Sequence, residues 1–356
     1  MNYNPDDVEE ANVNAGTGKL MINGMGPNYE GSHEMEFTIE KYDIGASYAE
    51  PAGNITVENL VTDVVLDEVL AGDAEGVDFS EFNKDAVVQT ELEVMYTPVR
   101  LDGTKGDARP LDETEYSVSY ENNTEIGTAT ITITGIGNNF TGTVTREFKI
   151  RGDLSAKSTT LEVEDWIYTP ANADGSSTNT PEPVVKYTYT SFNGTEKTVE
   201  LEKGVDYQVR YENHKNATEG KDEKAKVIIS QVEGADGQVT GNYVNSKEAE
   251  FDIKQRDLSN AIEGDGIQKD PDLDVTGLVE EGYEYTGSPI IPELNITCKG
   301  TNLSGIVEGT SDSDTYDYVL SAANNVDVYT YALSSTGGRE RVYPTVTVTA
   351  HKNEDG

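Results

Sequence analysis

Apolar and polar residues alternate in several short segments of this chain. In residues 128–134, three apolar side chains alternate with four threonines. The same period of two occurs in residues 115–120 and in residues 144–150, where Phe148 and Ile150 fall on one face. Successive side chains of a β-strand point to opposite faces of the sheet. The pattern therefore predicts strands whose sheets have one dry face and one wet face.

Turn-forming residues separate these segments, and helical patterns are scarce. Residues 121–123 and 135–142 are rich in asparagine and glycine, which is typical of connections between strands. The best helix candidate is residues 60–70, where apolar residues are numerous but no clear cap flanks them. Either a short helix or a strand is compatible with that segment. The expected fold class is all-β.

The chain also repeats itself. Residues 16–39 align without a gap with residues 127–150. The matched positions share glycines, an Asn-aromatic pair and a final Phe-x-Ile: Gly16, Ile22, Gly24, Gly26, Asn28, Tyr29, Gly31, Phe37 and Ile39 fall on Gly127, Ile133, Gly135, Gly137, Asn139, Phe140, Gly142, Phe148 and Ile150. A site residue need occur only once, whereas a fold determinant must recur in every copy. Packing and tight turns are therefore the simplest interpretation of the repeated positions.

Two further copies follow. The third shares its tyrosines and glycines with the second: Tyr187, Gly194, Tyr207, Tyr211 and Asn213 match Tyr96, Gly103, Tyr116, Tyr120 and Asn122, and Gly241-Asn242-Tyr243 and Phe251-Asp252-Ile253 close it. The fourth copy is looser and contains Tyr285-Thr286-Gly287, Tyr316-Asp317-Tyr318 and Asn324-Asn325-Val326. A period of about 100 residues is typical of a sandwich domain rather than of a solenoid repeat.

These motifs resemble the bacterial immunoglobulin-like (Big/MBG-type) repeats of large surface proteins of Gram-positive bacteria. The similarity rests on the run EYSVSYENNTEIGTATITITGIGNNFTGTVTREFKI and on EYTGSPIIPELNI. It is strong in residues 85–150, good in 12–39 and 181–253, and weak in 284–350, where the Gly-x-x-Asn-Tyr-x-Gly turn is missing. The resemblance implies exported, cell-wall-attached proteins in which such repeats serve as stalks, spacers or adhesive modules, and it implies no catalytic residues.

The predicted organisation is a string of immunoglobulin-like β-sandwiches. We expect a partial module at 1–41 that holds only the last strands, then modules at 42–152 and 153–256, and a divergent module at 257–356. The linkers between them are short, so we expect an elongated rod. The partial first module has two interpretations. The chain, which shows no leader segment at its start, can be a piece of a longer array. Alternatively, it can be a fibre subunit completed by a strand from a neighbour.

The composition argues against several classes of binding partner. The 66 acidic and 26 basic side chains leave a formal charge of −40, which argues against nucleic-acid binding and against attachment to anionic membranes. Hydrophobic residues make up only 35% of the chain, and 20 tyrosines stand against 7 phenylalanines and one tryptophan. We therefore expect sheets with modest cores. No apolar run is long enough to span a bilayer, so no membrane insertion is expected. The single cysteine, Cys298, excludes an intramolecular disulfide and is interpreted as a small, partly buried residue.

Candidate chemistry is sparse. The three histidines lie in different copies, and no metalloprotease, nucleophile-elbow or phosphate-loop motif occurs, so we expect no enzymatic activity. Calcium is the one possible cofactor, because Asp270, Asp272 and Asp274 lie in an acidic segment between copies three and four, near residues 263–266. Residues 312–314 form a second acidic loop. The alternative for both segments is a solvated linker surrounded by counter-ions.

Trp166 has two interpretations. An exposed tryptophan can stack on sugar rings, but this one lies in a strand-like run, so a partly buried core residue is the expected role.

The sequence favours a non-catalytic extracellular stalk or adhesin segment on a bacterial cell surface. Its expected partners are neighbouring modules of the same or a longer chain. One alternative is a subunit of a self-assembling fibre, pilus-like or of a surface layer, whose partners are identical subunits. Another is a module that binds a host glycan or protein, with the divergent fourth copy as the first candidate for the site.

Overall fold

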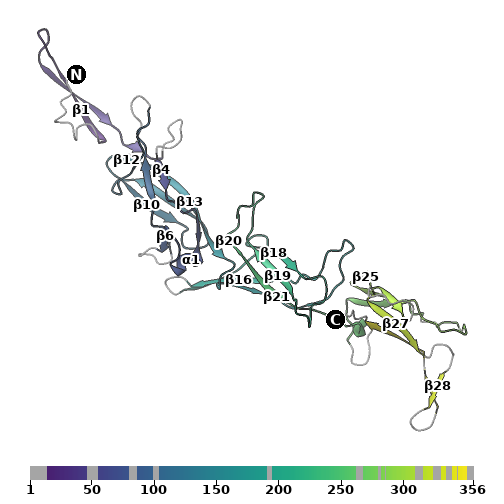
Figure 1. Cartoon of the computed structure of the whole chain (residues 1–356). Coiled ribbons are helices and arrows are strands. Elements are labelled where there is room, and N and C mark those ends of the chain that lie inside the picture. Colours follow the sequence, from purple (N-terminus) through teal and green to yellow (C-terminus); the bar gives the residue numbers. More distant parts are fainter. Residues whose placement is uncertain are drawn as a thin grey trace. The chain divides into compact units, whose positions relative to one another are not determined.

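The computed structural model describes residues 14–45, 55–79, 86–98, 104–190, 195–261, 268–279, 282–284, 286–308, 316–323, 330–333, 339–342 and 344–350. Within these ranges the chain is mostly β-strand, with one six-residue α-helix and one 3-10 helix (Figure 1). The predicted all-β class is confirmed. Among these residues, no helix has both the length and the apolar character that a membrane span requires.

The chain divides into two compact units. The first comprises Met1–Thr160, Val185–Gln208 and Ile229–Lys247, and the second comprises Leu161–Val184, Val209–Ile228 and Glu248–Gly356. The division falls inside the third repeat, so it does not test the module boundaries expected from the sequence.

The first unit begins with a hairpin and continues into several small sheets. Its elements are β1 (Gly16–Asn23), β2 (Ser32–Ile39), β3 (Tyr42–Asp43), β4 (Ile55–Glu58), β5 (Asp63–Val65), α1 (Leu66–Ala71), β6 (Val77–Phe79), β7 (Val87–Gln89), β8 (Glu93–Tyr96), β9 (Arg109–Pro110), β10 (Tyr116–Glu121), β11 (Gly127–Gly135), β12 (Phe140–Thr141), β13 (Thr143–Asp153), β17 (Glu196–Glu200) and β20 (Tyr243–Val244). Strands β10, β11 and β13 form an antiparallel ladder, and β5 and β20 each pair with β13 in parallel. The remaining strands pair as β4–β8–β9, β6–β7 and β3–β12.

The alternation read from the sequence is confirmed in the β10–β11–β13 ladder. Ala129, Ile131 and Ile133 of β11 have no exposed surface, and Phe148 and Ile150 of β13 are buried on the same side. The register places Ala129 opposite Phe148. A period of two has therefore put the apolar set on the core face, as sheet geometry requires.

Residues 60–70 adopt both of the structures that the sequence left open. The short strand β5 leads directly into α1, which buries Leu66 and Val69. No side chain caps the start of this helix, and Gly72 ends it in the left-handed conformation, where its N–H reaches the carbonyls of Glu68 and Val69. Because the helix has a C-terminal cap but no N-terminal one, only one of its two ends carries the usual sequence signal.

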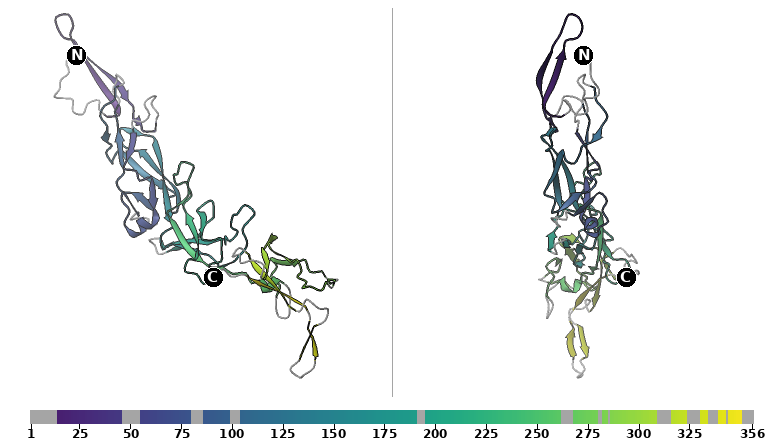
Figure 2. Two further views of the ribbon diagram at one scale, coloured as in Figure 1. Left: turned by 45° about the vertical axis from the view of Figure 1, so that its right-hand side comes forward. Right: turned by 90° about the vertical axis from the view of Figure 1, so that its left-hand side faces the viewer.

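The β1–β2 hairpin is a separate two-stranded sheet with an uncovered apolar face (Figure 2). Leu20 is 42% exposed and Phe37 is 46% exposed. The aligned residues of the next repeat, Ile131 and Phe148, are buried. The strands of the two copies thus share their local pattern, and they differ in whether another layer covers them.

The remaining strands belong to the third and fourth repeats. Strands with residues in both units are β14 (Thr159–Glu162), β16 (Val184–Thr190), β18 (Gln208–Glu212), β19 (Ala225–Ser230) and β21 (Ser246–Phe251). The second unit alone holds β15 (Trp166–Ile167), β22 (Ile253–Lys254), the 3-10 helix η2 (Leu258–Ala261), β23 (Leu273–Thr276), β24 (Asn295–Cys298), β25 (Thr301–Asn302), β26 (Gly305–Val307), β27 (Tyr318–Ala323), β28 (Thr330–Leu333), β29 (Arg339–Val342) and β30 (Thr345–Ala350). They pair as β14–β16–β17, β18–β19–β21, β15–β22, β23–β24–β25, β26–β27–β30 and β28–β29.

The second unit contains small separate cores. One is built on Ala225, Val227, Phe251 and Ile253, and Trp166 packs against it as a half-buried residue. Two others lie nearby along the chain and include Leu273 with Cys298, and Ile296 with Tyr318 and Leu320. The expected role of Trp166 in a core is therefore confirmed.

Cys298 is more buried than the sequence led us to expect. It is 2% exposed, and burial raises the pKa of its thiol. A buried thiol of this kind is a packing residue rather than a nucleophile.

Candidate functional site: the junctions between repeats

The segments that follow the last strand of each repeat share a local structure. Each contains an aspartate followed by isoleucine or leucine: Asp43-Ile44, Asp153-Leu154 and Asp257-Leu258. In all three, the carboxylate accepts the backbone N–H two residues on, from Gly45, Ser155 and Ser259, at 2.8–2.9 Å. This is an Asx turn, which fixes the direction in which the chain enters the next repeat. We call residues 41–45, 151–155 and 255–259 the linkers.

The first two linkers pair with the Asn-aromatic segment of the following repeat. The N–H of Tyr42 donates to the Asn139 carbonyl at 2.7 Å, and that of Ile44 donates to Thr141 at 2.8 Å. This is a two-residue parallel bridge between β3 and β12. The aspartate turn then leads the chain away from it.

The second linker repeats this geometry. The N–H of Gly152 donates to the Asn242 carbonyl at 3.1 Å, and that of Leu154 donates to Val244 at 2.9 Å. Strands β13 and β20 are parallel here, and Leu154 is completely buried. The Asn-aromatic pair that recurs in the sequence therefore serves as the docking edge for the linker.

The aromatic residue of each pair packs at the linker. Phe140 is buried and makes edge-on contacts with Tyr42 and Tyr96, at centroid distances of 6.1 and 5.2 Å. Tyr243 is buried beside Tyr187, with centroids 5.5 Å apart. The packing role expected for these repeated aromatics is thus seen at both linkers.

A close backbone approach explains one linker glycine. A Cβ atom on Gly152 would lie 2.7 Å from the Tyr243 ring. That distance is shorter than van der Waals contact, so only glycine lets the Tyr243 ring lie this close to the linker backbone.

Arg151 joins the second repeat to the third. Its side chain is only 7% exposed. The guanidinium donates to the Asp63 carboxylate at 2.5 Å, to the Gly241 carbonyl and to the Val239 carbonyl at 3.3 Å. A buried guanidinium is tolerated only with this degree of pairing. The arginine therefore links β5 to the loop that precedes β20.

Asp67, at the start of α1, is a second link between these repeats. It accepts hydrogen bonds from the hydroxyls of Tyr187 (2.7 Å) and Ser158 (2.5 Å) and from the backbone N–H of Asp153 (3.0 Å). Burial, followed by the neighbouring Asp67 carboxylate, raises the pKa of Tyr187. The tyrosine therefore stays protonated and donates at any ordinary pH. The sequence did not reveal this role of Asp67, because its partners lie 86 to 120 residues further along the chain.

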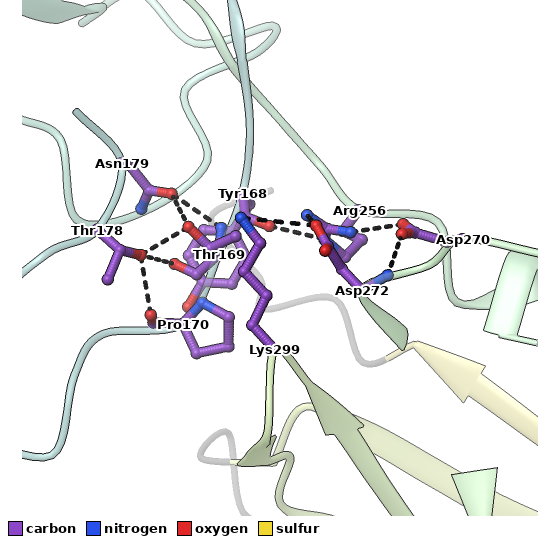
Figure 3. Close-up of polar contacts among 9 residues, drawn as sticks. All are labelled: Tyr168, Thr169, Pro170, Thr178, Asn179, Arg256, Asp270, Asp272 and Lys299. Carbon is purple, nitrogen blue, oxygen red and sulfur yellow. Dashed lines mark hydrogen bonds and ion pairs between the residues drawn. The ribbon is translucent and has the colours of Figure 1, made fainter. Parts of the chain in front are cut away.

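Arg256 is the buried arginine of the third linker, one residue before Asp257 (Figure 3). Its side chain is 8% exposed, and it donates to the Tyr168 carbonyl at 2.9 Å, to Asp270 at 2.5 Å and to Asp272 at 3.1 Å. Asp270 also accepts the N–H of Asp272, and Lys299 lies 3.6 Å from the Asp272 carboxylate. The cluster brings together two arginine-bound carboxylates and a second cation.

A small polar network holds the carbonyl that Arg256 uses. Asn179, 1% exposed, accepts the N–H of Thr169 at 2.8 Å, and the hydroxyls of Thr169 and Thr178 lie 2.6 Å apart. Thr178 also donates to the Pro170 carbonyl at 3.1 Å (Figure 3). These bonds fix residues 168–179, and with them the orientation of the Tyr168 carbonyl.

The predicted calcium ligands are only partly gathered. Asp270 and Asp272 meet at Arg256, whereas Asp274 pairs with Lys269 at 3.3 Å. In the part of the chain that the structure describes, no group of three or more acidic, histidine or cysteine side chains has an arrangement that would hold a metal ion. Residues 263–266 and 312–314 lie outside the described residues. Calcium binding stays a prediction, and it would have to compete with the arginine.

A groove lies beside this cluster. Among the described residues it is lined by Trp166, Asp165, Lys299, Arg256 and Asp270, and its volume is about 1140 Å³. The Lys299 ammonium lies 5.9 Å from the centre of the Trp166 ring, and the indole N–H is buried with no hydrogen-bond partner among the described residues. Trp166 therefore has one side in a core and another on this groove.

The histidines do not form a catalytic group in the described residues. His33 lies on β2, and His214 stacks beside Tyr211 at 5.6 Å, where burial lowers its pKa. His351 lies outside the described residues.

Comparison with known proteins gives no match. No protein family, no curated protein and no solved structure is similar to this chain. The resemblance to bacterial immunoglobulin-like repeats therefore rests on the motifs of the sequence. Functional inference rests on the geometry of the linkers.

Proposed function

We propose that this chain is a non-catalytic stalk segment of an extracellular bacterial surface protein, built from tandem immunoglobulin-like sandwich modules in an elongated rod. The observation that carries the proposal is the pair of linkers at 41–45 and 151–155, which dock in the same way on the following repeat. A spacer needs successive modules that do not bend freely. The sequence motifs add the expectation of a cell-surface location.

The linker contacts are suited to resist bending. Each of these two linkers forms backbone hydrogen bonds with the next repeat within a residue or two of the last strand of its own repeat, so little free chain remains between repeats. At the second linker, Arg151 and Asp67 add contacts on either side of the backbone bridge. A hinge there would have to break several partly buried polar interactions at once. The net charge of −40 favours solubility and keeps copies apart.

The test is small-angle X-ray scattering combined with light scattering. We expect a monomer with an elongated profile, and we expect Arg151→Ala to broaden the distribution of shapes without unfolding the chain. Arg146→Ala is the matched control, because this arginine lies on the same strand but is exposed, and within the described residues its guanidinium bonds to its neighbour Thr145 alone. A compact particle, or an oligomer at all concentrations, would refute the stalk.

A second candidate function is glycan binding at the groove beside Trp166. It is favoured by an aromatic ring, a nearby lysine and an indole N–H with no partner among the described residues. A glycan array followed by Lys299→Ala tests it, since this residue lines the groove and is exposed. Trp166→Phe, which keeps the core packed, tests the indole N–H. Loss of saturable binding in both variants is expected if the groove is a site, and unchanged binding removes it.

A further inference from the structure

The turn in the first hairpin closes with the same backbone hydrogen bond as the turn in the next repeat. The N–H of Gly24 donates to the Gly31 carbonyl at 2.8 Å, and that of Gly135 donates to the Gly142 carbonyl at 3.0 Å. Gly31 and Gly142 both have positive φ, 87° and 81°. The two turns therefore share their closing bond and their last glycine, whereas Gly26 has a positive φ of 103° and the aligned Gly137 does not.

In the second repeat, this turn is occupied by a linker. Asn139 and Thr141 accept the N–H groups of residues 42 and 44 through their backbone carbonyls. Lys41 adds a third bond, from its ammonium to the Gly137 carbonyl at 2.8 Å. Phe140 lies beneath the linker and is 8% exposed.

In the hairpin, the equivalent positions are open. Asn28, Tyr29 and Glu30 align with residues 139–141, and we call them the 28–30 edge. Within the described part of the chain, no group donates to the carbonyls of Asn28 or Glu30, and Tyr29 is 75% exposed. The hairpin thus has an exposed tyrosine where the second repeat has a buried aromatic residue, and this tyrosine stands between two carbonyls that have no donor among the described residues. These are the groups that a linker contacts in the second repeat.

We infer that the 28–30 edge binds an extended peptide with the chemistry of this chain's own linkers, a basic residue two places before an aspartate that isoleucine or leucine follows. Lys41-Tyr42-Asp43-Ile44 and Arg151-Gly152-Asp153-Leu154 have this form. Addition of a strand to an open edge gives affinity through main-chain bonds, and side-chain contacts give selectivity.

Each part of the peptide has a defined partner. Its two N–H groups donate to the carbonyls of Asn28 and Glu30, and the first of these two residues, at the position of Tyr42 or Gly152, packs on the Tyr29 ring. The basic side chain reaches the Gly26 carbonyl, which is equivalent to Gly137. The aspartate caps its own turn, as Asp43 and Asp153 do. This inference concerns a partner of the chain and holds whether or not the chain serves as a stalk.

Nuclear magnetic resonance of the full chain, labelled with ¹⁵N at glycine only, tests the inference. The probe is a capped synthetic peptide of residues 39–45, IEKYDIG. We expect saturable shifts of the resonances of Gly24, Gly26 and Gly31. The resonances of Gly135, Gly137 and Gly142 should not move, because the chain's own linker already fills that edge.

Three variants sharpen the test. Tyr29→Ala should weaken binding about tenfold, the equivalent of roughly 1.4 kcal/mol, because the ring contact is lost. Tyr29→Phe should bind like the parent chain, since phenylalanine fills the equivalent position 140. Ile136→Ala alters an exposed side chain of the occupied turn, at the position that aligns with Met25, and should change nothing.

Several results would overturn the inference. One is the absence of shifts at Gly24, Gly26 and Gly31 at millimolar peptide, and another is an equal response to a scrambled peptide of the same composition. Shifts that grow with protein concentration and do not change on addition of peptide would show that a second copy covers the edge instead. A flexible particle in scattering would refute the stalk and leave this result unaffected, so the two failures are distinguishable.

Discussion

At the scale of single residues, a few buried or half-buried polar side chains hold neighbouring repeats together. Asp67 accepts three hydrogen bonds from residues of the following repeat, and Arg151 donates to acceptors on both sides of the linker. Removal of one partner from such a contact is strongly destabilising, because the other partner is left without a hydrogen bond. The first prediction below follows from such a group, whereas the second concerns an exposed carboxylate that caps its own turn.

Tyr187→Phe should destabilise the chain by about 1–3 kcal/mol, because Asp67 loses a buried hydrogen-bond donor and the ring keeps its packing. Urea unfolding followed by tyrosine fluorescence measures the change. Tyr116→Phe is the control, since that ring is only half-buried and none of the described hydrogen bonds involves its hydroxyl. Equal stability of the two variants would show that Asp67 does not depend on the tyrosine.

Asp257→Ala should destabilise the chain at neutral pH but not in acid. The side chain and backbone of Ser259 donate to the Asp257 carboxylate and lower its pKa from 3.8. A lowered folded-state pKa gives stability that is present above the unfolded value and lost as pH falls through the folded value. The difference between parent and variant should therefore shrink as the pH falls below the ordinary aspartate value. A difference that is constant with pH in denaturant unfolding would contradict a role for the charge.

At the scale of elements, the short parallel bridge is the repeated device. Strands β3 and β12 pair over two residues, as β13 and β20 do, and both bridges end in an aspartate turn. The antiparallel strands of the ladder obey the period-two pattern, so the sequence predicted them well. The bridges are too short to have a period, and only their recurrence in the sequence marked the Asn-aromatic pair as important.

Gly152→Ala should loosen the second bridge. A Cβ atom there would lie 2.7 Å from the Tyr243 ring and 3.1 Å from Ile126 Cδ1, so the ring must move. We expect a destabilisation of about 1–3 kcal/mol in urea unfolding, as for other overpacked sites. In a Tyr243→Ala background the same substitution should have a much smaller effect, because the clash is gone. Additive effects of the two changes would mean that this contact does not limit the approach of the linker.

At the scale of the whole molecule, the proposed rod has two physical sources that can be separated. One is the linker contacts and the other is repulsion within a chain of net charge −40. Salt screens the second, with a Debye length of about 10 Å at 0.1 M, and leaves buried contacts nearly unchanged.

We therefore expect the radius of gyration of the parent chain to change little between low and high salt in X-ray scattering. The Arg151→Ala variant should contract with salt, because charge alone would then keep its repeats apart. A parent chain that contracts as much as the variant would assign the extension to charge rather than to the linkers.

The sequence by itself determined the all-β class, the faces of β11 and β13 and the recurrence of the Asn-aromatic pair. These features are local, since a period of two or a turn glycine acts over a few residues. The tertiary structure decided which copy has a covered face, so that Ile131 is buried while Leu20 is exposed. It also determined that Asp270 and Asp272 pair with Arg256 and that Asp67 accepts a hydrogen bond from Tyr187. Those outcomes depend on which segments distant in the chain come together, and no periodicity along a single strand carries that information.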